Sequence, residues 1–294
     1  MNLSRRYIRA HALRIARAPF FLPSLERLLV SKTLGTPYEG FTSKLPPNPC
    51  DYSHGTCRDV VRYGFRMRLD LSDLVPWYLY WGFSDPSHDV IVGNCRPGDV
   101  VLDVGANIGI TVMRIAERIG RSGKVFGFEP DPTNFASLKH HIELNGLTNA
   151  EPLNAAASDC PGDLFLTVKN PRNRGMNQVS ATSSAESIRV PAVTLDSFVA
   201  ERGIGPVNLI KVDAEGFEHR VLRGAEAILR RDRPRLCLEV IDSHLRDCDG
   251  SADELVKWVR DLDYEVSDAE TGEAVVEWAS LDGASLELIC RPIA

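Results

Sequence analysis

Short apolar runs alternate with amphipathic stretches along the chain from about residue 59 onward. Four runs have the length and composition of strands that are buried on both faces: 100–104, 124–128, 207–212 and 235–241. Four stretches show the period of an amphipathic helix: 109–119, 132–144, 217–229 and 252–262. This alternation predicts an α/β fold, in which a parallel sheet is covered by helices on both faces.

Polar residues near the ends of these stretches mark element boundaries. Asp131 followed by Pro132 is a typical helix start, and Asp196 is expected to cap the helix that begins at Ser197. Residues 163–193 depart from the alternation, because apolar positions at both ends bracket a polar stretch. We interpret them as a hairpin or an extended excursion that helps to shape a substrate pocket.

The N-terminal segment combines basic and apolar residues in a loosely amphipathic pattern. Residues 1–34 contain Glu26 as their one acid, and their basic residues are Arg5, Arg6, Arg9, Arg14, Arg17, Arg27 and Lys32. The pattern predicts a helix with two alternative roles: it packs on its own domain, or it contacts anionic lipid or a partner protein. We favour packing on its own domain, because Pro19 and Pro23 interrupt the apolar face. A proline-rich loop follows, so we predict a basic helical segment and linker over 1–58 and one domain over 59–294.

Composition and charge narrow the class of protein. With 44% apolar and 25% charged residues, the chain is ordinary for a soluble globular protein. No apolar run approaches the roughly eighteen residues of a membrane-spanning helix, and no secretory signal is indicated, which predicts a cytoplasmic protein. The net charge of −6 divides into +6 for residues 1–34 and −12 for the rest. An acidic main domain argues against nucleic acid as a partner.

The seven cysteines are scattered without a CxxC pair, which disfavours a zinc ribbon and predicts free thiols. No group of histidines and carboxylates has the spacing of a metal site either, so we expect no metal. No feature of the sequence predicts an oligomeric state.

The strongest chemical signal is the segment VVLDVGANIG at 100–109. An apolar strand ends at Asp103, and a tight glycine turn leads into a helix, which lets a ligand approach the backbone closely. A nicotinamide-type fingerprint would carry another glycine where Asn107 stands, and a phosphate loop would need Gly-Lys-Ser/Thr. The candidate cofactor-binding residues of this turn are Asp103, Gly105, Ala106, Asn107 and Gly109.

Two further segments complete the predicted cofactor pocket. FGFEPD at 126–131 places Glu129 and Pro130 at the end of the next strand, where the two oxygens of a carboxylate match the two hydroxyls of a ribose. NAAASD at 154–159 offers Ala156, small enough to leave room for a flat ring, and Asp159, an acceptor for an exocyclic amine.

The second half carries VTLDSFV at 193–199, LIKVDAEGFEHRVLRGA at 209–225 and RLCLEV at 235–240. Together with the glycine turn and FEP, over residues 70–245, these segments resemble the FkbM family of S-adenosylmethionine-dependent methyltransferases. The resemblance implies a class I methyltransferase (Rossmann-like) sheet with an N-terminal helical appendage and O-methylation of sugar or natural-product hydroxyls. One stretch departs from the family, since Phe83-Ser84-Asp85 stands where an aromatic-Glu pair is typical.

Lys211, Asp213 and Glu215 form the candidate catalytic group. They alternate along the end of one strand, and ligands of open α/β sheets bind outside the carboxyl ends of strands. We expect Asp213 to be the base or to orient the substrate, Glu215 to be the second candidate base, and Lys211 to hold the carboxylate or polarise the acceptor. His219 and His244 are conceivable bases, Glu239 is a plausible nearby contact, and Glu218 and Arg220 are expected in surface ion pairs.

The sequence thus predicts an S-adenosylmethionine-dependent O-methyltransferase that acts on a small-molecule hydroxyl of a sugar or natural product. Two alternatives remain at this point, because fold alone does not decide chemistry. One is a nicotinamide-dependent oxidoreductase, and the other is a protein that binds S-adenosylmethionine without catalysis.

Overall fold

A computed structural model describes residues 15–40, 42–276, 278 and 285–293. Residues 1–14, which hold four of the seven N-terminal basic residues, lie outside the described residues. The chain divides into two compact units, the first formed by residues 1–86 with 171–175 and the second by residues 87–170 with 176–294. The predicted boundary at residue 58 falls within the first unit.

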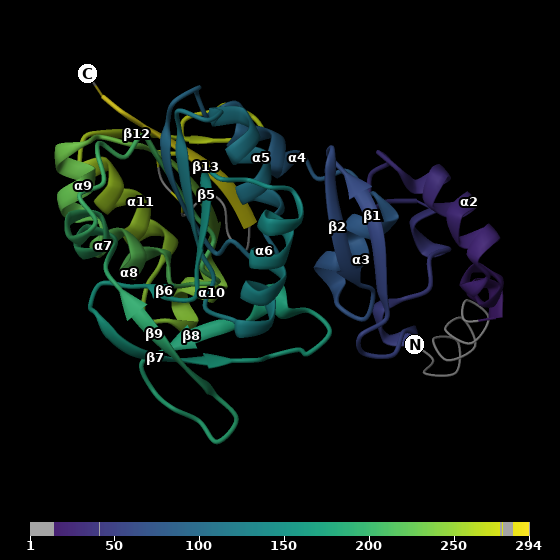
Figure 1. Cartoon of the computed structure of the whole chain (residues 1–294). Coiled ribbons are helices and arrows are strands. Elements are labelled where there is room, and N and C mark those ends of the chain that lie inside the picture. Colours follow the sequence, from purple (N-terminus) through teal and green to yellow (C-terminus); the bar gives the residue numbers. More distant parts are fainter. Residues whose placement is uncertain (1–14, 41, 277, 279–284, 294) are drawn as a thin grey trace. The chain divides into compact units, whose positions relative to one another are not determined.

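The second unit is built on a seven-stranded sheet (Figure 1). Across the sheet the strands are β12 (Tyr264–Asp268), β13 (Ser285–Pro292), β11 (Arg235–Ile241), β10 (Leu209–Val212), β3 (Val100–Val104), β4 (Lys124–Phe128) and β5 (Ala150–Leu153). Strands β11, β10, β3, β4 and β5 pair in parallel, whereas β13 is antiparallel to both β11 and β12. The four strands predicted from apolar runs are consecutive neighbours in this sheet.

Helices cover both faces of the sheet, as predicted (Figure 1). One face packs against α4 (Pro86–Gly93), α5 (Ile110–Ile119) and α6 (Pro132–Leu144). The other packs against α7 (Leu195–Glu201), α8 (Glu218–Arg223), α9 (Glu226–Arg231), α10 (Asp242–Asp247) and α11 (Ala252–Asp261). Successive strand residues serve opposite faces, so that Val101 packs in the first layer and Leu102 in the second.

Two of the predicted helix caps have different outcomes. Asp131 caps α6 as expected, since its carboxylate accepts the N–H groups of Thr133 and Asn134. The prediction that Asp196 caps its own helix is wrong. Thr194 caps α7, whereas Asp196 accepts N–H groups at the start of α9, because the fold brings that helix end beside it.

The predicted helix over 217–229 is two helices, α8 and α9, with a break at Gly224. A Cβ on Gly224 would lie 1.9 Å from the carbonyl oxygen of Ser158, and the Gly224 carbonyl accepts the N–H of Asp196 at 2.9 Å. These backbone contacts come from segments distant in sequence, so the periodicity alone could not show the break.

The excursion over 163–193 forms most of a second, four-stranded sheet with the order β6-β9-β7-β8. Its strands are β6 (Ala156–Ala157), β9 (Ile188–Val193), β7 (Gly162–Thr167) and β8 (Gln178–Ser180). Strands β7 and β9 pair antiparallel, as a hairpin requires. Apolar side chains of this sheet pack against Phe217, directly after the turn that carries Glu215.

The first unit contains a hairpin of β1 (Cys57–Arg62) and β2 (Phe65–Asp70) together with α2 (Pro23–Thr33) and α3 (Leu74–Trp81). Short 3-10 turns, η1 (Ala18–Phe21), η2 (Thr42–Lys44) and η3 (Pro49–Asp51), lie between these elements or before them, and η4 (Arg174–Met176) begins in the segment that returns to this unit. Trp77, Trp81 and Phe83 are buried in its core. Within the described part of the chain, no helix has both the length and the apolar character to cross a membrane, and all seven cysteines are free, as predicted.

Candidate active site

The turn between β3 and α5 consists of the predicted residues Gly105, Ala106, Asn107 and Gly109, with Ile108 among them. Gly105 has φ 78°, and a Cβ there would lie 1.8 Å from the carbonyl oxygen of Asp213. Glycine is therefore required at this position. The N–H groups of Gly105 and Ala106 both donate to the carbonyl oxygen of Phe128 at 3.0 Å, which fastens the turn to the end of β4.

Glu129 follows β4 and closes the turn from the other side. Its Oε2 accepts the N–H of Asn107 and its Oε1 the N–H of Asp131, both at 2.8 Å. Burial raises the pKa of Glu129 to about 8, although these two donors oppose the shift. A carboxylate offers about four acceptor positions, so each oxygen can still accept a bond from a ligand.

Lys211 joins the cofactor turn to the candidate catalytic group. Its Nζ lies 3.2 Å from Oδ1 of Asp103 and 3.2 Å from Oδ2 of Asp213, and it donates to the carbonyl oxygen of Gly105 at 2.8 Å. Burial by itself lowers the pKa of Lys211, but the two carboxylates outweigh it and raise the pKa above its ordinary value. Lys211 therefore stays charged and holds strands β3 and β10 together at their carboxyl ends.

Asp103 is fully buried at the end of β3. Its Oδ2 has no hydrogen-bond partner among the described residues. Burial raises the pKa of this carboxyl group, and Lys211 opposes that shift. A buried acceptor of this kind is satisfied when a ligand brings a donor or a positive charge to it.

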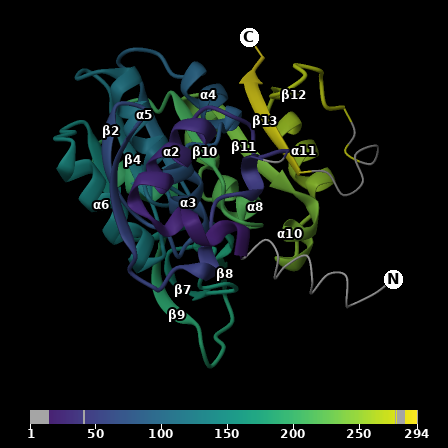
Figure 2. The same cartoon turned by 90° about the vertical axis from the view of Figure 1, so that its right-hand side faces the viewer.

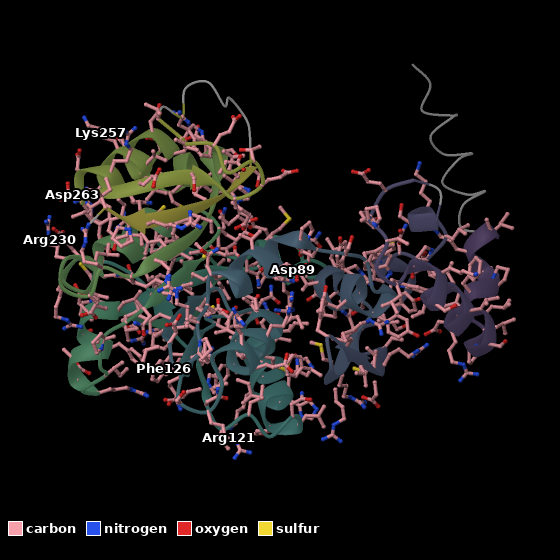
Figure 3. The ribbon with its side chains drawn as sticks, turned by 90° about the horizontal axis from the view of Figure 1, so that it is seen from above. Asp89, Arg121, Phe126, Arg230, Lys257 and Asp263 are labelled. Carbon is pink, nitrogen blue, oxygen red and sulfur yellow. The ribbon has the colours of Figure 1, made fainter. Side chains whose placement is uncertain are left out.

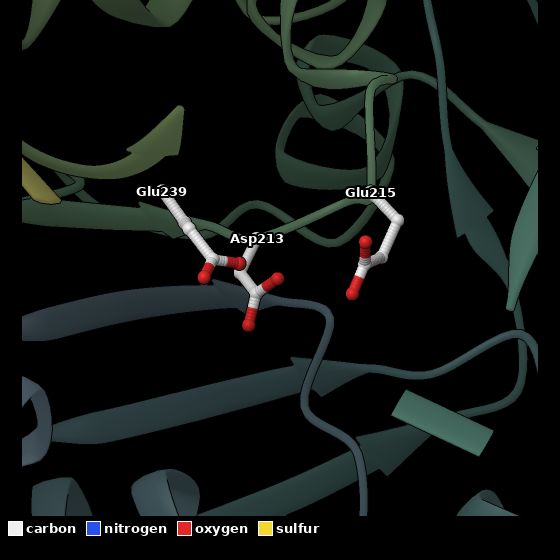
Figure 4. Close-up of side chains that lie close together, drawn as sticks. All are labelled: Asp213, Glu215 and Glu239. Carbon is white, nitrogen blue, oxygen red and sulfur yellow. The ribbon is translucent and has the colours of Figure 1, made fainter. Parts of the chain in front are cut away.

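Three carboxyl groups meet at the ends of β10 and β11 (Figure 4). One oxygen from each of Asp213, Glu215 and Glu239 lies within 4.8 Å of the others. Such a group has the geometry to hold a metal ion, which the residue spacing did not suggest. Lys211 already places a positive charge against Asp213, however, and our expectation of no metal stays a prediction.

The three carboxyl groups differ in acidity. The charge of Asp213, followed by burial, raises the pKa of Glu239 to about 10, so Glu239 is protonated at neutral pH and hydrogen-bonds to Asp213. Burial opposes ionisation of Asp213, but the charge of Lys211 and the bond from Glu239 lower its pKa. Burial and the charge of Asp213 raise the pKa of Glu215 to about 8. Glu215 is thus a stronger base than Asp213.

Glu215 has φ 51°, in the left-handed region, and Gly216 follows it with φ 105°. Its Oε2 lies 2.9 Å from Nδ1 of His244 in α10. Burial lowers the pKa of His244, which keeps the imidazole neutral near pH 7. The tight turn places the Glu215 carboxyl group beside His244, although neither Oε2 nor Nδ1 has a hydrogen-bond partner among the described residues.

Glu218, expected in a surface ion pair, is buried instead. One of its carboxylate oxygens accepts the N–H groups of Ala214 and Gly216, at 2.9 and 3.1 Å. Burial raises its pKa to about 7. The prediction failed because its partners are backbone groups of a turn that only the fold creates, and Glu218 is what stabilises the turn around Glu215.

The third predicted cofactor segment lies after β5. Ala156 is buried in β6, and the side-chain amide of Asn154 donates to the carbonyl oxygens of Glu129 and Pro130, at 2.8 and 3.1 Å. Asp159 forms an ion pair of 3.4 Å with Arg220. Asp159 is therefore paired with a partly exposed arginine, whereas the ion pair of Asp103 with Lys211 is buried.

Sequence reasoning missed two residues of this region. Asn154 connects the second and third cofactor segments. It is the first residue of the segment 154–159, in which only Ala156 and Asp159 were selected. His88 in α4 lies near enough to Asp103 and Asp213 for its charge to lower the pKa of both. No motif surrounds His88, so no sequence signal pointed to it. His219, by contrast, is partly exposed in α8, as predicted.

Residues 103–266, more than half of the chain, match the methyltransferase FkbM domain. The chain belongs to the FkbM methyltransferase family. The match begins at Asp103 and contains the glycine turn, Glu129 and the three carboxyl groups. The predicted family, the methyltransferase activity and the Rossmann-like fold are thereby confirmed, and S-adenosylmethionine is the cofactor of this family.

Relatives of this FkbM-family chain include three named methyltransferases. It is 31% identical over 193 residues to the 31-O-demethyl-FK506 methyltransferase FkbM of Streptomyces tacrolimicus, covering 56% of this chain and 72% of the relative. It is 25% identical to the 2-O-methyltransferase NoeI of Sinorhizobium fredii, covering 47% and 62%. It is 30% identical to the hexuronic acid methyltransferase AglP of Haloferax volcanii, covering 46% and 53%. The chain thus spans less than two thirds of the length of NoeI and of AglP.

Among solved structures, a methyltransferase FkbM from Methylobacillus flagellatus KT matches with a TM-score of 0.44 and 15% identity. The match covers 74% of this chain and 52% of that protein.

Proposed function

We propose that this protein transfers the methyl group of S-adenosylmethionine to a hydroxyl group of a sugar or natural product. The observation that carries the proposal is the group of Asp213, Glu215 and Glu239 beside the glycine turn. A carboxylate with a raised pKa suits the removal of a proton from a hydroxyl. The relatives' names agree, since two of them specify transfer to oxygen and the third a sugar acid.

The residues around the glycine turn fit S-adenosylmethionine. Glu129 has an open acceptor position on each oxygen for the two ribose hydroxyls. The buried Oδ2 of Asp103 lacks a partner among the described residues and suits the ammonium group of the cofactor. Gly105, Ala106, Asn107, Gly109 and Pro130 supply close backbone approach, while Ala156 and Asp159 are proposed to border the adenine.

When bound, S-adenosylmethionine supplies an electrophilic methyl group on a positively charged sulfur. Transfer breaks the sulfur–carbon bond, forms an oxygen–carbon bond and releases the hydroxyl proton. Glu215 is our first candidate to accept that proton, because its pKa is about 8 and it belongs to the group of three carboxyl groups beside the glycine turn. Asp213, whose charge Lys211 offsets, is better suited to orient the acceptor hydroxyl.

The test is methyl transfer by the full chain to a panel of sugar and natural-product alcohols, followed by mass spectrometry. We expect a product heavier by one methylene unit, at equal rates with and without EDTA. Transfer to matched amines or thiols but to no alcohol would contradict the proposal. Cofactor binding without transfer to any member of the panel would favour the non-catalytic alternative, and binding of NADH would favour the oxidoreductase.

Glu129 leads to a prediction about cofactor binding. Hydroxyl donors stabilise a charged carboxylate, so binding should lower the pKa of Glu129 from about 8 and release a proton near neutral pH. Glu129→Ala should weaken binding about tenfold to a hundredfold for each ribose hydroxyl that it releases, because a hydrogen bond to a charged group contributes about 1.5–3 kcal/mol. Calorimetry in two buffers of different ionisation enthalpy measures both effects. Proton release that persists in Glu129→Gln would contradict this role.

A further inference from the structure

The segment from Ile15 to the end of α2 carries several exposed apolar and basic side chains. Ile15, Phe21, Leu22 and Leu28 have relative exposures of 64, 41, 58 and 55%. Arg27 and Lys32 are exposed on the same short segment. We call these six residues the N-terminal surface; Figure 2 turns α2, in purple, toward the reader. Apolar side chains concentrated in this way typically mark an interaction site.

Buried polar contacts set the rotation of α2 about its axis. Glu26, Leu29 and Thr33, spaced three and four residues apart, form the buried side of the helix. Glu26 accepts bonds from Arg58, at 2.9 and 3.2 Å, and from the hydroxyl of Tyr80. The hydroxyl of Thr33 donates to the carbonyl oxygen of Trp81. Because these bonds are directional, Arg27, Leu28 and Lys32 are kept on the outside.

The charge of the N-terminal surface is of one sign. Glu26 is the one acid between residues 15 and 38, and it is buried and paired with Arg58. Nothing acidic in that stretch therefore offsets Arg27 and Lys32. An anionic lipid surface attracts such cations and takes up adjacent apolar side chains. A symmetric contact with a second copy would instead oppose this basic surface to itself.

We propose that the N-terminal surface binds the protein to anionic lipid membranes as a peripheral contact. The apolar side chains enter the interface between headgroups and acyl chains, and the basic side chains pair with lipid phosphates. The inference does not depend on the proposed methyl acceptor. We expected the N-terminal helix to pack on its own domain, and the buried side of α2 does so within the first unit. The proposal adds that its exposed side contacts lipid.

The experiment is co-sedimentation of the full chain with vesicles of phosphatidylcholine alone or of phosphatidylcholine with phosphatidylglycerol. Binding is expected to the anionic vesicles and should fall at high salt. Arg27→Gln with Lys32→Gln should weaken it about 30-fold, since each basic residue near an anionic membrane contributes about fivefold. Phe21→Ser, Leu22→Ser and Leu28→Ser together should abolish it.

Arg121→Gln with Lys257→Gln is the matched control, because it removes the same charge from exposed positions of the second unit (Figure 3). This control should bind like the wild type, and circular dichroism should show all variants folded. The proposal is overturned if the full chain ignores anionic vesicles, or if the charge variant binds them as well as the control does. Light scattering that shows the apolar variant breaking a dimer would assign the surface to a second copy instead.

Discussion

Replacing Lys211 with methionine is expected to lower the free energy of unfolding by about 3–5 kcal/mol, the usual loss when one partner of a buried ion pair is removed. The substitution leaves the fully buried Asp103 without its counter-charge and frees Asp213 as well. It also removes a bond to the carbonyl oxygen of Gly105. Equilibrium unfolding in urea measures the change, and cofactor affinity should fall with it.

The pH dependence separates this explanation from a simple packing defect. The contribution of the ion pair is present at neutral pH and is lost as the carboxylates become protonated. The difference between wild type and Lys211→Met should therefore shrink as the pH falls. Lys139→Met is the control, because Lys139 is exposed and lies 4.0 Å from its partner Glu143. A loss at Lys211 no larger than that of the control would show that the pair does not hold the two strands together.

Glu215→Gln should reduce kcat by about a hundredfold to ten-thousandfold, the range over which general bases act. The variant keeps the size of the side chain but cannot accept the hydroxyl proton. In the wild type, the rate should rise as the pH increases through about 8, because Glu215 must lose its own proton to act as a base. Methyl-transfer kinetics over a pH series, with cofactor affinity measured in parallel, test this prediction.

Glu239→Gln offers a matched comparison at the neighbouring carboxyl group. With a pKa of about 10, Glu239 is already neutral at pH 7, and an amide can donate to Asp213 as the protonated acid does. Glu239→Gln should therefore retain most of the activity. If Glu239→Gln and Glu215→Gln lose activity equally, or if Glu215→Gln keeps the pH profile of the wild type, Glu215 is not the base.

The sheet could be predicted because its signals are local. Residues 100–104, 124–128 and 235–241 are apolar runs of strand length, and each coincides with an observed strand. Lys211 and Asp213 could be placed together because they alternate at the end of one strand. The prediction that Glu215 continues this alternation is wrong, since β10 ends at Val212 and Glu215 lies on the turn that follows. Gly105 was chosen for a tight turn, and the turn is observed.

What the sequence could not show are contacts between distant segments. In the sequence Glu218 resembles an exposed acid of a helix. In the fold it accepts the N–H groups of Ala214 and Gly216 instead. His244 was a conceivable base on its own, but its contact with Glu215 depends on the position of α10. Asp196 likewise has a partner helix that lies some thirty residues further along the chain. In each case the sequence showed a side chain that can form a polar contact, but it did not show which group the side chain contacts.

The approach of Gly105 to the backbone of Asp213 has a consequence for the divergence of such enzymes. There is no room for even a methyl group between Gly105 and Asp213, so the glycine turn and the turn that carries Glu215 cannot shift independently. A change of methyl acceptor is therefore difficult to achieve by remodelling either turn. Variation is less restricted in strands β7, β8 and β9, which belong to a separate sheet. We therefore expect exchange of those strands between relatives to change the methyl acceptor more readily than substitutions in either turn.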